Sequence, residues 1–166
     1  MARLTTIEIS KQYLSFSAAH FTVFSATERE RLHGHNYRVS ASFQAPVGEN
    51  GMTFDYNVFK NKLKEICNDL DEYLLLPEQS PHLAISASGN SYEVRYGEEV
   101  MTFLQADTLL LPIVNTTVEE YSYYILNILR ETSAQEIAEY DIRMISVQIG
   151  SGDGQSGLTE WYKSAD

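Results

Sequence analysis

Apolar residues alternate with polar ones along three segments of this chain, and this period of two most restricts what the chain can fold into. The segments cover residues 7–18, about 35–45, and 142–149. The apolar residues that share a face are Leu14, Phe16 and Ala18 in the first, Tyr37, Val39, Ala41 and Phe43 in the second, and Ile145, Val147 and Ile149 in the third. Because successive side chains of a strand point to opposite faces, each segment predicts a strand with one buried face.

Two other stretches repeat their apolar residues every three or four positions, which predicts helices. The stripes are Phe59, Leu63, Ile66 and Leu70 in the first, and Val118, Tyr121, Ile125, Ile128 and Leu129 in the second. We expect Asp55 or Asn57 to cap the first helix. Two pairs at the start of the second helix have the spacing of a capping box, Thr116 with Glu119 and Thr117 with Glu120.

Between the helices, residues 83–104 have the pattern of a meander of short strands, with turns at 88–90 and 97–98. The order of elements is strand, strand, helix, meander, helix, strand. This order favours an α+β fold, with an antiparallel sheet that carries two helices on one face. The length of 166 residues fits a single domain over 1–166.

Charge and composition exclude several kinds of partner. The chain has 23 acidic and 12 basic residues, a net charge of -11, so we expect no binding of nucleic acid or of an anionic membrane surface. No apolar run approaches the roughly 20 residues of a membrane-spanning helix. The first six residues lack the apolar core of a secretory signal, and Cys67 has no second cysteine to pair with. We therefore expect a cytoplasmic protein.

Three of the four histidines are candidates for a metal site. His33 and His35 are two residues apart, so on a strand both rings project to the same face. His20 ends the preceding strand, and in an antiparallel pair the end of one strand lies beside the start of the next. Three neutral imidazoles without a fourth protein ligand are typical of a catalytic zinc site. The alternative is that they are ordinary polar or core histidines.

The segments 16–20 and 32–37, Phe-Ser-Ala-Ala-His and Leu-His-Gly-His-Asn-Tyr, resemble the signature of the 6-pyruvoyl-tetrahydropterin synthase / 6-carboxytetrahydropterin synthase family. Similar motifs follow in the same order, at residues 51–56, 70–72 and 115–119. The resemblance spans nearly the whole chain and agrees with the predicted order of elements.

This resemblance implies a tunnelling fold, in which a four-stranded antiparallel sheet carries two helices on one face. The meander would be an insertion at about 78–108. Members of the family form trimers or hexamers with active sites between subunits. They bind Zn²⁺ through histidines that correspond to His20, His33 and His35, and they act on 7,8-dihydroneopterin triphosphate or a related dihydropterin.

The catalytic residues that the resemblance implies differ from the usual set. Arg29 stands where many members have a cysteine, and Glu72 stands where a histidine follows the aspartate Asp71. The motif Glu30-x-x-His33-Gly-His35, however, resembles a branch of the family in which a glutamate replaces the cysteine. Members of that branch cleave the substrate side chain to give 6-hydroxymethyl-7,8-dihydropterin. We therefore expect Glu30 to be the general base, assisted by Asp71 and Glu72; the alternative is that Glu30 is a solvated charge in a charged loop.

Substrate binding by the family implies roles for Thr116 and Thr117 at the start of the second helix. The glutamate that usually grips the pterin ring after the last strand is missing, because Gly150 and Ser151 occupy that place. Asp153 is the expected substitute. Two functions follow: a zinc-dependent lyase acting on a dihydropterin, or a zinc-binding relative of the same fold that binds another small ligand without turning over pterins.

Overall fold

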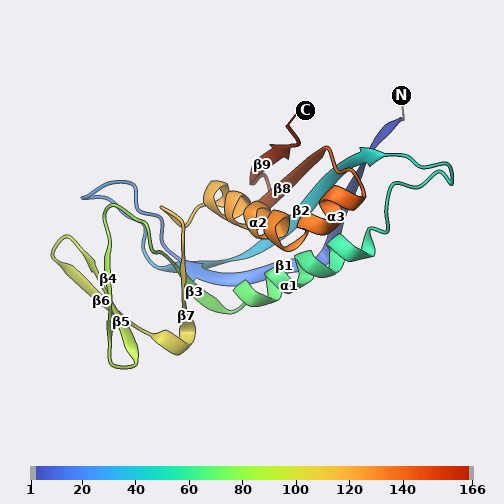
Figure 1. Cartoon of the computed structure of the whole chain (residues 1–166). Coiled ribbons are helices and arrows are strands. Elements are labelled where there is room, and N and C mark those ends of the chain that lie inside the picture. Colours follow the sequence, from blue (N-terminus) through green and yellow to red (C-terminus); the bar gives the residue numbers. More distant parts are fainter. Residues whose placement is uncertain (1–2, 165–166) are drawn as a thin grey trace.

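The computed structural model describes residues 3–164, and its larger sheet has six strands in the order β7-β3-β1-β2-β8-β9 (Figure 1). The six strands are β1 (Leu4–His20), β2 (His33–Pro46), β3 (Tyr73–Pro77), β7 (Thr108–Leu111), β8 (Met144–Gly152) and β9 (Gln155–Tyr162). The pairs β1–β2, β2–β8 and β8–β9 are antiparallel, whereas β3 lies parallel to β1 and β7 parallel to β3. The predicted α+β class is confirmed, but the expected four-stranded antiparallel sheet is wrong in its strand number and in being purely antiparallel.

The strands that the sequence did not reveal lack a clear alternation. β3 contains the run Leu74-Leu75-Leu76, which is buried throughout and so has no polar side. A short apolar run of this kind does not distinguish a strand from a buried turn of helix. In β9 only Gly157 is fully buried, and a glycine carries no apolar signal.

An irregularity in the pairing of β1 with β2 decides which residues of β1 face the helices. Ser10 lies opposite Ser40, and Ser15 lies opposite Arg38. Over this interval β1 advances five residues while β2 advances two, so β1 holds an odd number of additional residues. The ladder is locally interrupted there, as in a bulge.

Because the excess is odd, it reverses the alternation of β1. Before the irregularity the odd-numbered Ile9 is buried, and after it the even-numbered Leu14 and Phe16 are buried. The predicted shared face of Leu14, Phe16 and Ala18 is therefore confirmed. His20, also even-numbered, comes to lie on the same face as the buried odd-numbered residues of β2.

Helix α1 (Asn57–Leu70) packs on β1 and buries its predicted stripe completely. Full burial of each such side chain contributes about 1.5–3 kcal/mol to folding. Cys67 lies on the same buried side, and burial raises the pKa of its thiol to about 11, so it is a packing residue. The N-cap is Tyr56, without a side-chain cap, so the prediction of Asp55 or Asn57 is wrong; the Asp55 carboxylate instead accepts from the backbone and side-chain N–H of Asn57.

Helix α2 (Val118–Thr132) covers β8 and β9 on the same side of the sheet and contacts α1 (Figure 1). Of the two predicted capping pairs the structure has Thr117 with Glu120: the Thr117 hydroxyl accepts from the Glu120 N–H. The Glu120 carboxylate does not complete the box but accepts from the N–H of Val114. A short helix that was not predicted, α3 (Ala134–Glu139), follows.

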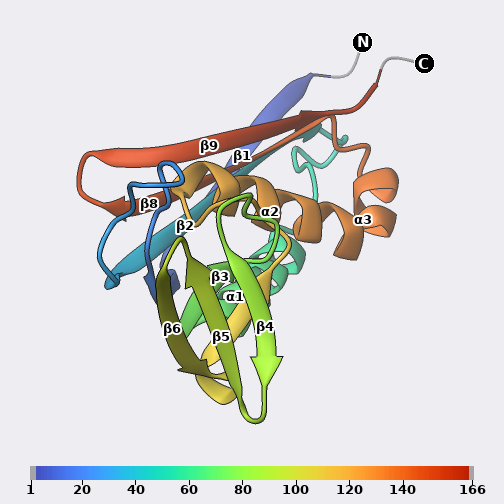
Figure 2. The same ribbon diagram turned by 90° about the vertical axis from the view of Figure 1, so that its left-hand side faces the viewer.

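The predicted meander forms a second, three-stranded sheet of β4 (Ala84–Ser88), β5 (Ser91–Tyr96) and β6 (Glu99–Leu104). A single 3₁₀ turn, Gln105–Asp107, links it to β7. Figure 2 shows its three strands side by side, at the end of the molecule away from both termini. That residues 1–166 form one domain with an insertion at about 78–108 stays a prediction. Among the described residues, no helix is long and apolar enough to cross a membrane.

Strand β9 passes the first turn of α2 at Gly157, and this contact gives a test of the fold. A Cβ added at Gly157 would lie 2.7 Å from the carbonyl carbon and oxygen of Val118. Because backbone atoms cannot move aside as a flexible side chain does, we expect Gly157→Val to lower the free energy of unfolding by about 1–3 kcal/mol in urea denaturation. A Cβ at Gly152, in β8, would meet nothing within 4 Å. The control Gly152→Ala should therefore change stability by less than about 0.5 kcal/mol, and equal losses in both variants would contradict the close contact.

Candidate metal centre

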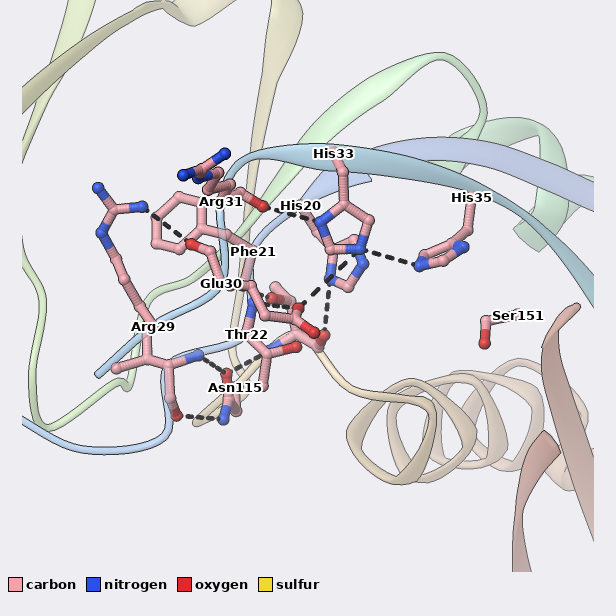
Figure 3. A network of polar contacts seen from close by, with 12 residues as sticks. His20, Phe21, Thr22, Arg29, Glu30, Arg31, His33, His35, Asn115 and Ser151 are labelled. Carbon is pink, nitrogen blue, oxygen red and sulfur yellow. Dashed lines mark hydrogen bonds and ion pairs between the residues drawn. The ribbon is translucent and has the colours of Figure 1, made fainter.

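Three histidines meet where β1 ends and β2 begins. In the antiparallel register His20 lies opposite His33, and Ala18 lies opposite His35. One ring nitrogen of each histidine lies within 4.8 Å of those of the other two. Figure 3 shows the three rings gathered beside the start of α2. The rings therefore converge, as predicted from the end of one strand lying beside the start of the next, and they could hold a metal ion.

His20 is the buried member of the trio, with 5% of its surface exposed. Its Nδ1 lies 2.9 Å from the carbonyl oxygen of Thr116. Because a carbonyl only accepts, Nδ1 carries the proton and Nε2 presents a lone pair. Burial lowers the pKa of His20 to about 4, so the ring is neutral at pH 7. A neutral imidazole oriented by a carbonyl is typical of a metal ligand.

His33 is oriented in the same way. Its Nδ1 lies 2.8 Å from the carbonyl oxygen of Arg31, so its Nε2 faces the cluster. That Nε2 lies 3.0 Å from Nε2 of His35. Figure 3 shows both contacts as dashed lines. Two ring nitrogens at this distance need either a proton between them or a shared cation.

The hydrogen bonding of His20 Nε2 shows whether these residues fit a metal ion. This atom is buried and has no hydrogen-bond partner within the part of the chain that the structure describes. A buried polar atom without a partner costs about 1–3 kcal/mol. Coordination of a divalent ion by three Nε2 atoms would satisfy it, and it leaves a fourth position of a tetrahedral site without a protein ligand. The residues therefore fit the metal.

A cavity of about 300 Å³ adjoins the histidines. Its lining comes from the end of β1, the following loop, β2, the start of α2 and the β8–β9 hairpin; it includes Thr117, Glu119, Ser151, Gln155 and Ser156. Thr116 also lines it but is fully buried, and its hydroxyl donates to the carbonyl oxygen of Phe21. The side-chain hydroxyls of both predicted threonines thus already have partners in the protein.

Glu30 reaches the cavity from the loop between β1 and β2. Its Oε2 accepts from the backbone N–H of Thr22 at 3.1 Å and lies 4.0 Å from Nε2 of His33. Burial raises the pKa of Glu30, but the hydrogen bonds from Thr22 and the nearby His33 together outweigh it, so the pKa is lowered. The structure therefore places an ionised carboxylate beside the histidine trio.

Asp71 and Glu72 follow α1 and do not line the cavity that holds Glu30. The Asp71 carboxylate accepts from the N–H of Ser17 at 2.7 Å, and the Glu72 N–H donates to the Ser17 carbonyl. Glu72 has a φ of 65°, a conformation that non-glycine residues rarely adopt. It lines a separate cavity of about 480 Å³, to which His35 also contributes.

Asp153 lies in the turn between β8 and β9 and is exposed. It lines another cavity, together with Lys11 and Arg38, away from the histidines. Ser151 is the nearer part of this hairpin: it lines the histidine cavity, and Figure 3 shows it beyond His35. Within one chain, therefore, the structure does not bring Asp153 to the trio.

Two residues that sequence reasoning did not assign to the site support its geometry. The amide of Asn115 bonds both the N–H and the carbonyl of Val23 and also accepts from the Thr116 N–H. This ties the loop to the carbonyl that orients His20. Tyr37, whose ring meets those of His20 and His35 edge-on, is buried behind them, and burial raises the pKa of its phenol. In the sequence, the features that could have pointed to them are the place of Asn115 just before a predicted helix and that of Tyr37 on the apolar face of a predicted strand.

Comparison with known proteins shows similarity over almost the entire chain. A Methanocaldococcus jannaschii protein that carries the provisional name 6-carboxy-5,6,7,8-tetrahydropterin synthase is 29% identical over 150 residues, covering 90% of this chain and 91% of that one. The solved structure of Plasmodium falciparum 6-pyruvoyl tetrahydropterin synthase superimposes with a TM-score of 0.92 at 29% identity, covering 96% and 99% of the two chains. A Plasmodium vivax structure of the same name has a TM-score of 0.92 at 26% identity, covering 97% and 99%.

The family profile described as 6-pyruvoyl tetrahydropterin synthase matches residues 8–153, which include the histidine trio, Glu30 and the start of α2. This chain belongs to the 6-pyruvoyl tetrahydropterin synthase family.

Proposed function

We propose that this protein is a zinc-dependent lyase that acts on 7,8-dihydroneopterin triphosphate or a related dihydropterin. The observation that carries the proposal is the buried Nε2 of His20, which has no partner among residues 3–164, within a histidine trio that has a carboxylate 4.0 Å away. Zn²⁺ held by His20, His33 and His35 would supply a Lewis acid that polarises an oxygen of the substrate side chain. Family membership supports the pterin substrate.

Glu30 is the general base in this proposal. Its carboxylate is ionised, is held by the Thr22 N–H, and opens onto the cavity where a substrate side chain would meet the trio. Such a base contributes about 10²–10⁴-fold to rate when it reaches the proton that it takes. Support comes from a second Plasmodium vivax structure, at 25% identity, whose description names a glutamate replaced by alanine as a catalytic residue. The branch of the family with this glutamate forms 6-hydroxymethyl-7,8-dihydropterin, which is the product we propose.

The remaining predicted residues enter the proposal through assembly. We propose a homo-oligomer, a trimer or hexamer, with active sites between subunits. Asp71 and Glu72 would then assist the base of a neighbouring subunit, since within one chain neither lines the cavity of Glu30 and Glu72 opens onto a different one. Thr116, Thr117 and Asp153 are proposed to contact the substrate.

A second candidate function is favoured by Ser151. This hydroxyl lines the histidine cavity where the family usually has a carboxylate to grip the pterin ring. Loss of a charge-assisted contact weakens ligand binding substantially. The alternative is therefore a zinc-binding relative that binds another small ligand and does not turn over pterins. A thermal-shift search would reveal such a ligand, because tight binding raises apparent stability.

The histidine trio gives a test of metal binding. We expect protein purified with zinc to carry about one equivalent per chain, as in a three-histidine site. His20→Ala should lose it, because two ligands remain and the buried carbonyl-oriented nitrogen is gone. His82→Ala is the matched control and should keep the metal, since His82 is not a member of the trio. The measurement is zinc content by elemental analysis after gel filtration. Retention of zinc by His20→Ala would refute the assigned ligands.

The assignment of Glu30 as the base is tested by activity. Incubation of the zinc-loaded protein with 7,8-dihydroneopterin triphosphate should give a cleaved or rearranged dihydropterin by chromatography. Glu30→Gln should lower kcat by about 10²-fold or more while zinc content is unchanged, since the amide cannot take a proton. Glu28→Gln, in the same loop, should leave kcat unchanged. Full activity of Glu30→Gln would move the role elsewhere, and no product at any zinc loading would reject the lyase.

A further inference from the structure

The loop that carries Glu30 rests on the three-stranded meander rather than on the main sheet alone. Phe21 and Val23, which flank Thr22, are buried in a small core of their own. The other buried members of this core are Leu74 and Leu76 of β3 and Val94 and Tyr96 of β5. The Tyr96 hydroxyl also donates to the carbonyl of Ser25, at the far turn of the loop. The loop that carries Glu30 therefore packs directly against the meander.

Arg29, the residue directly before Glu30, makes the polar connection between the same two parts. Its Nε and Nη2 both donate to Oε2 of Glu99, the first residue of β6, with Nε at 2.9 Å. Its guanidinium carbon lies 5.4 Å from the centre of the Phe21 ring and 5.6 Å from that of Tyr96. An arginine between two rings and a carboxylate is held in one orientation. Its side chain is 20% exposed, against 58% for Glu99.

The third contact of Arg29 reaches the base itself. Its Nη1 donates to the carbonyl oxygen of Glu30 at 2.9 Å, and Figure 3 shows this contact beside Phe21. The N–H of Glu30 donates to the carbonyl of Thr22, whose own N–H binds the Glu30 carboxylate. Three groups of Glu30 are thus held: its carbonyl by Arg29, and its N–H and its carboxylate by Thr22.

We propose that Arg29 is a positioning residue, which couples the meander to the catalytic carboxylate by holding the Glu30 backbone from Glu99, Phe21 and Tyr96. This inference rests on the proposed role of Glu30 as the base. The meander would thus affect catalysis through the position of Glu30, although none of its residues lines the histidine cavity. Arg29 itself touches neither the trio nor the cavity, so it acts through Glu30.

The experiment weakens the connection from its far side, by removing the charge of the Glu99 carboxylate. Glu99→Gln alters an exposed side chain and leaves the small core intact, so the variant should fold normally. We expect kcat to fall roughly tenfold, because a displaced base reaches its proton less often, while KM and zinc content stay unchanged. Arg29→Met, which keeps an unbranched apolar stem beside the rings but loses the donors, should lower kcat further, and Arg29→Lys should recover part of the loss by restoring the charge. The matched control is Glu93→Gln, which breaks the Arg95 ion pair within β5 and touches nothing in the loop.

A readout independent of activity separates this inference from the proposed function. Backbone hydrogen exchange at Glu30 should quicken several-fold in Glu99→Gln and Arg29→Met and stay unchanged in Glu93→Gln, because the Glu30 N–H is bonded to Thr22 within the held loop. Wild-type exchange and wild-type kcat in Glu99→Gln and Arg29→Met would overturn the positioning role. If the wild-type protein shows no lyase activity, the proposed function fails, and exchange alone decides whether Arg29 holds the loop.

Discussion

The pairing of β1 with β2 is the constraint on which the candidate site depends. It sets His20 opposite His33 and brings His35 to the same face. Because side chains alternate along a strand, a slip of one residue would turn His20 to the opposite face of the sheet. The two strands are fixed by a large buried face, so the cost of such a slip includes the whole core contribution of β1. Hydrophobic packing of the two strands thus determines where the metal ligands lie, and no separate interaction is needed to bring them together.

The rest of the site is attached to this rigid base by a few polar contacts. The loop between β1 and β2 has only an isolated bridge, between Val23 and Arg29, in place of regular pairing. Asn115 ties it to the start of α2, and Arg29 ties it to the meander. A carboxylate carried by such a loop can be placed beside a metal site without belonging to the sheet, which is common for catalytic groups on loops held by a scaffold.

Much of this arrangement could be predicted from the sequence, because the spacing of apolar residues and of histidines along a segment shows which side chains share a face. The face shared by Leu14 and Phe16, the stripe of α1 and the convergence of the histidines all follow from side-chain periodicity. The parallel strands β3 and β7 could not be predicted, since their pairing joins segments far apart and a run such as Leu74-Leu75-Leu76 has no period to read. The contacts of Arg29 were equally hidden, because Glu99 lies 70 residues away and only the fold makes them neighbours.

The interruption between Ser10 and Ser15 has a consequence for how this strand can vary in length. An odd excess of residues converts one alternation phase into the other, and His20 requires the second phase. In this chain, an insertion or deletion of one residue in this stretch would turn His20 to the opposite face, whereas a change of two residues would keep it on the face of the trio. The position of the first metal ligand therefore depends on whether the number of residues in this stretch is odd or even, and not on the side chains of Lys11, Gln12 and Tyr13, which are exposed.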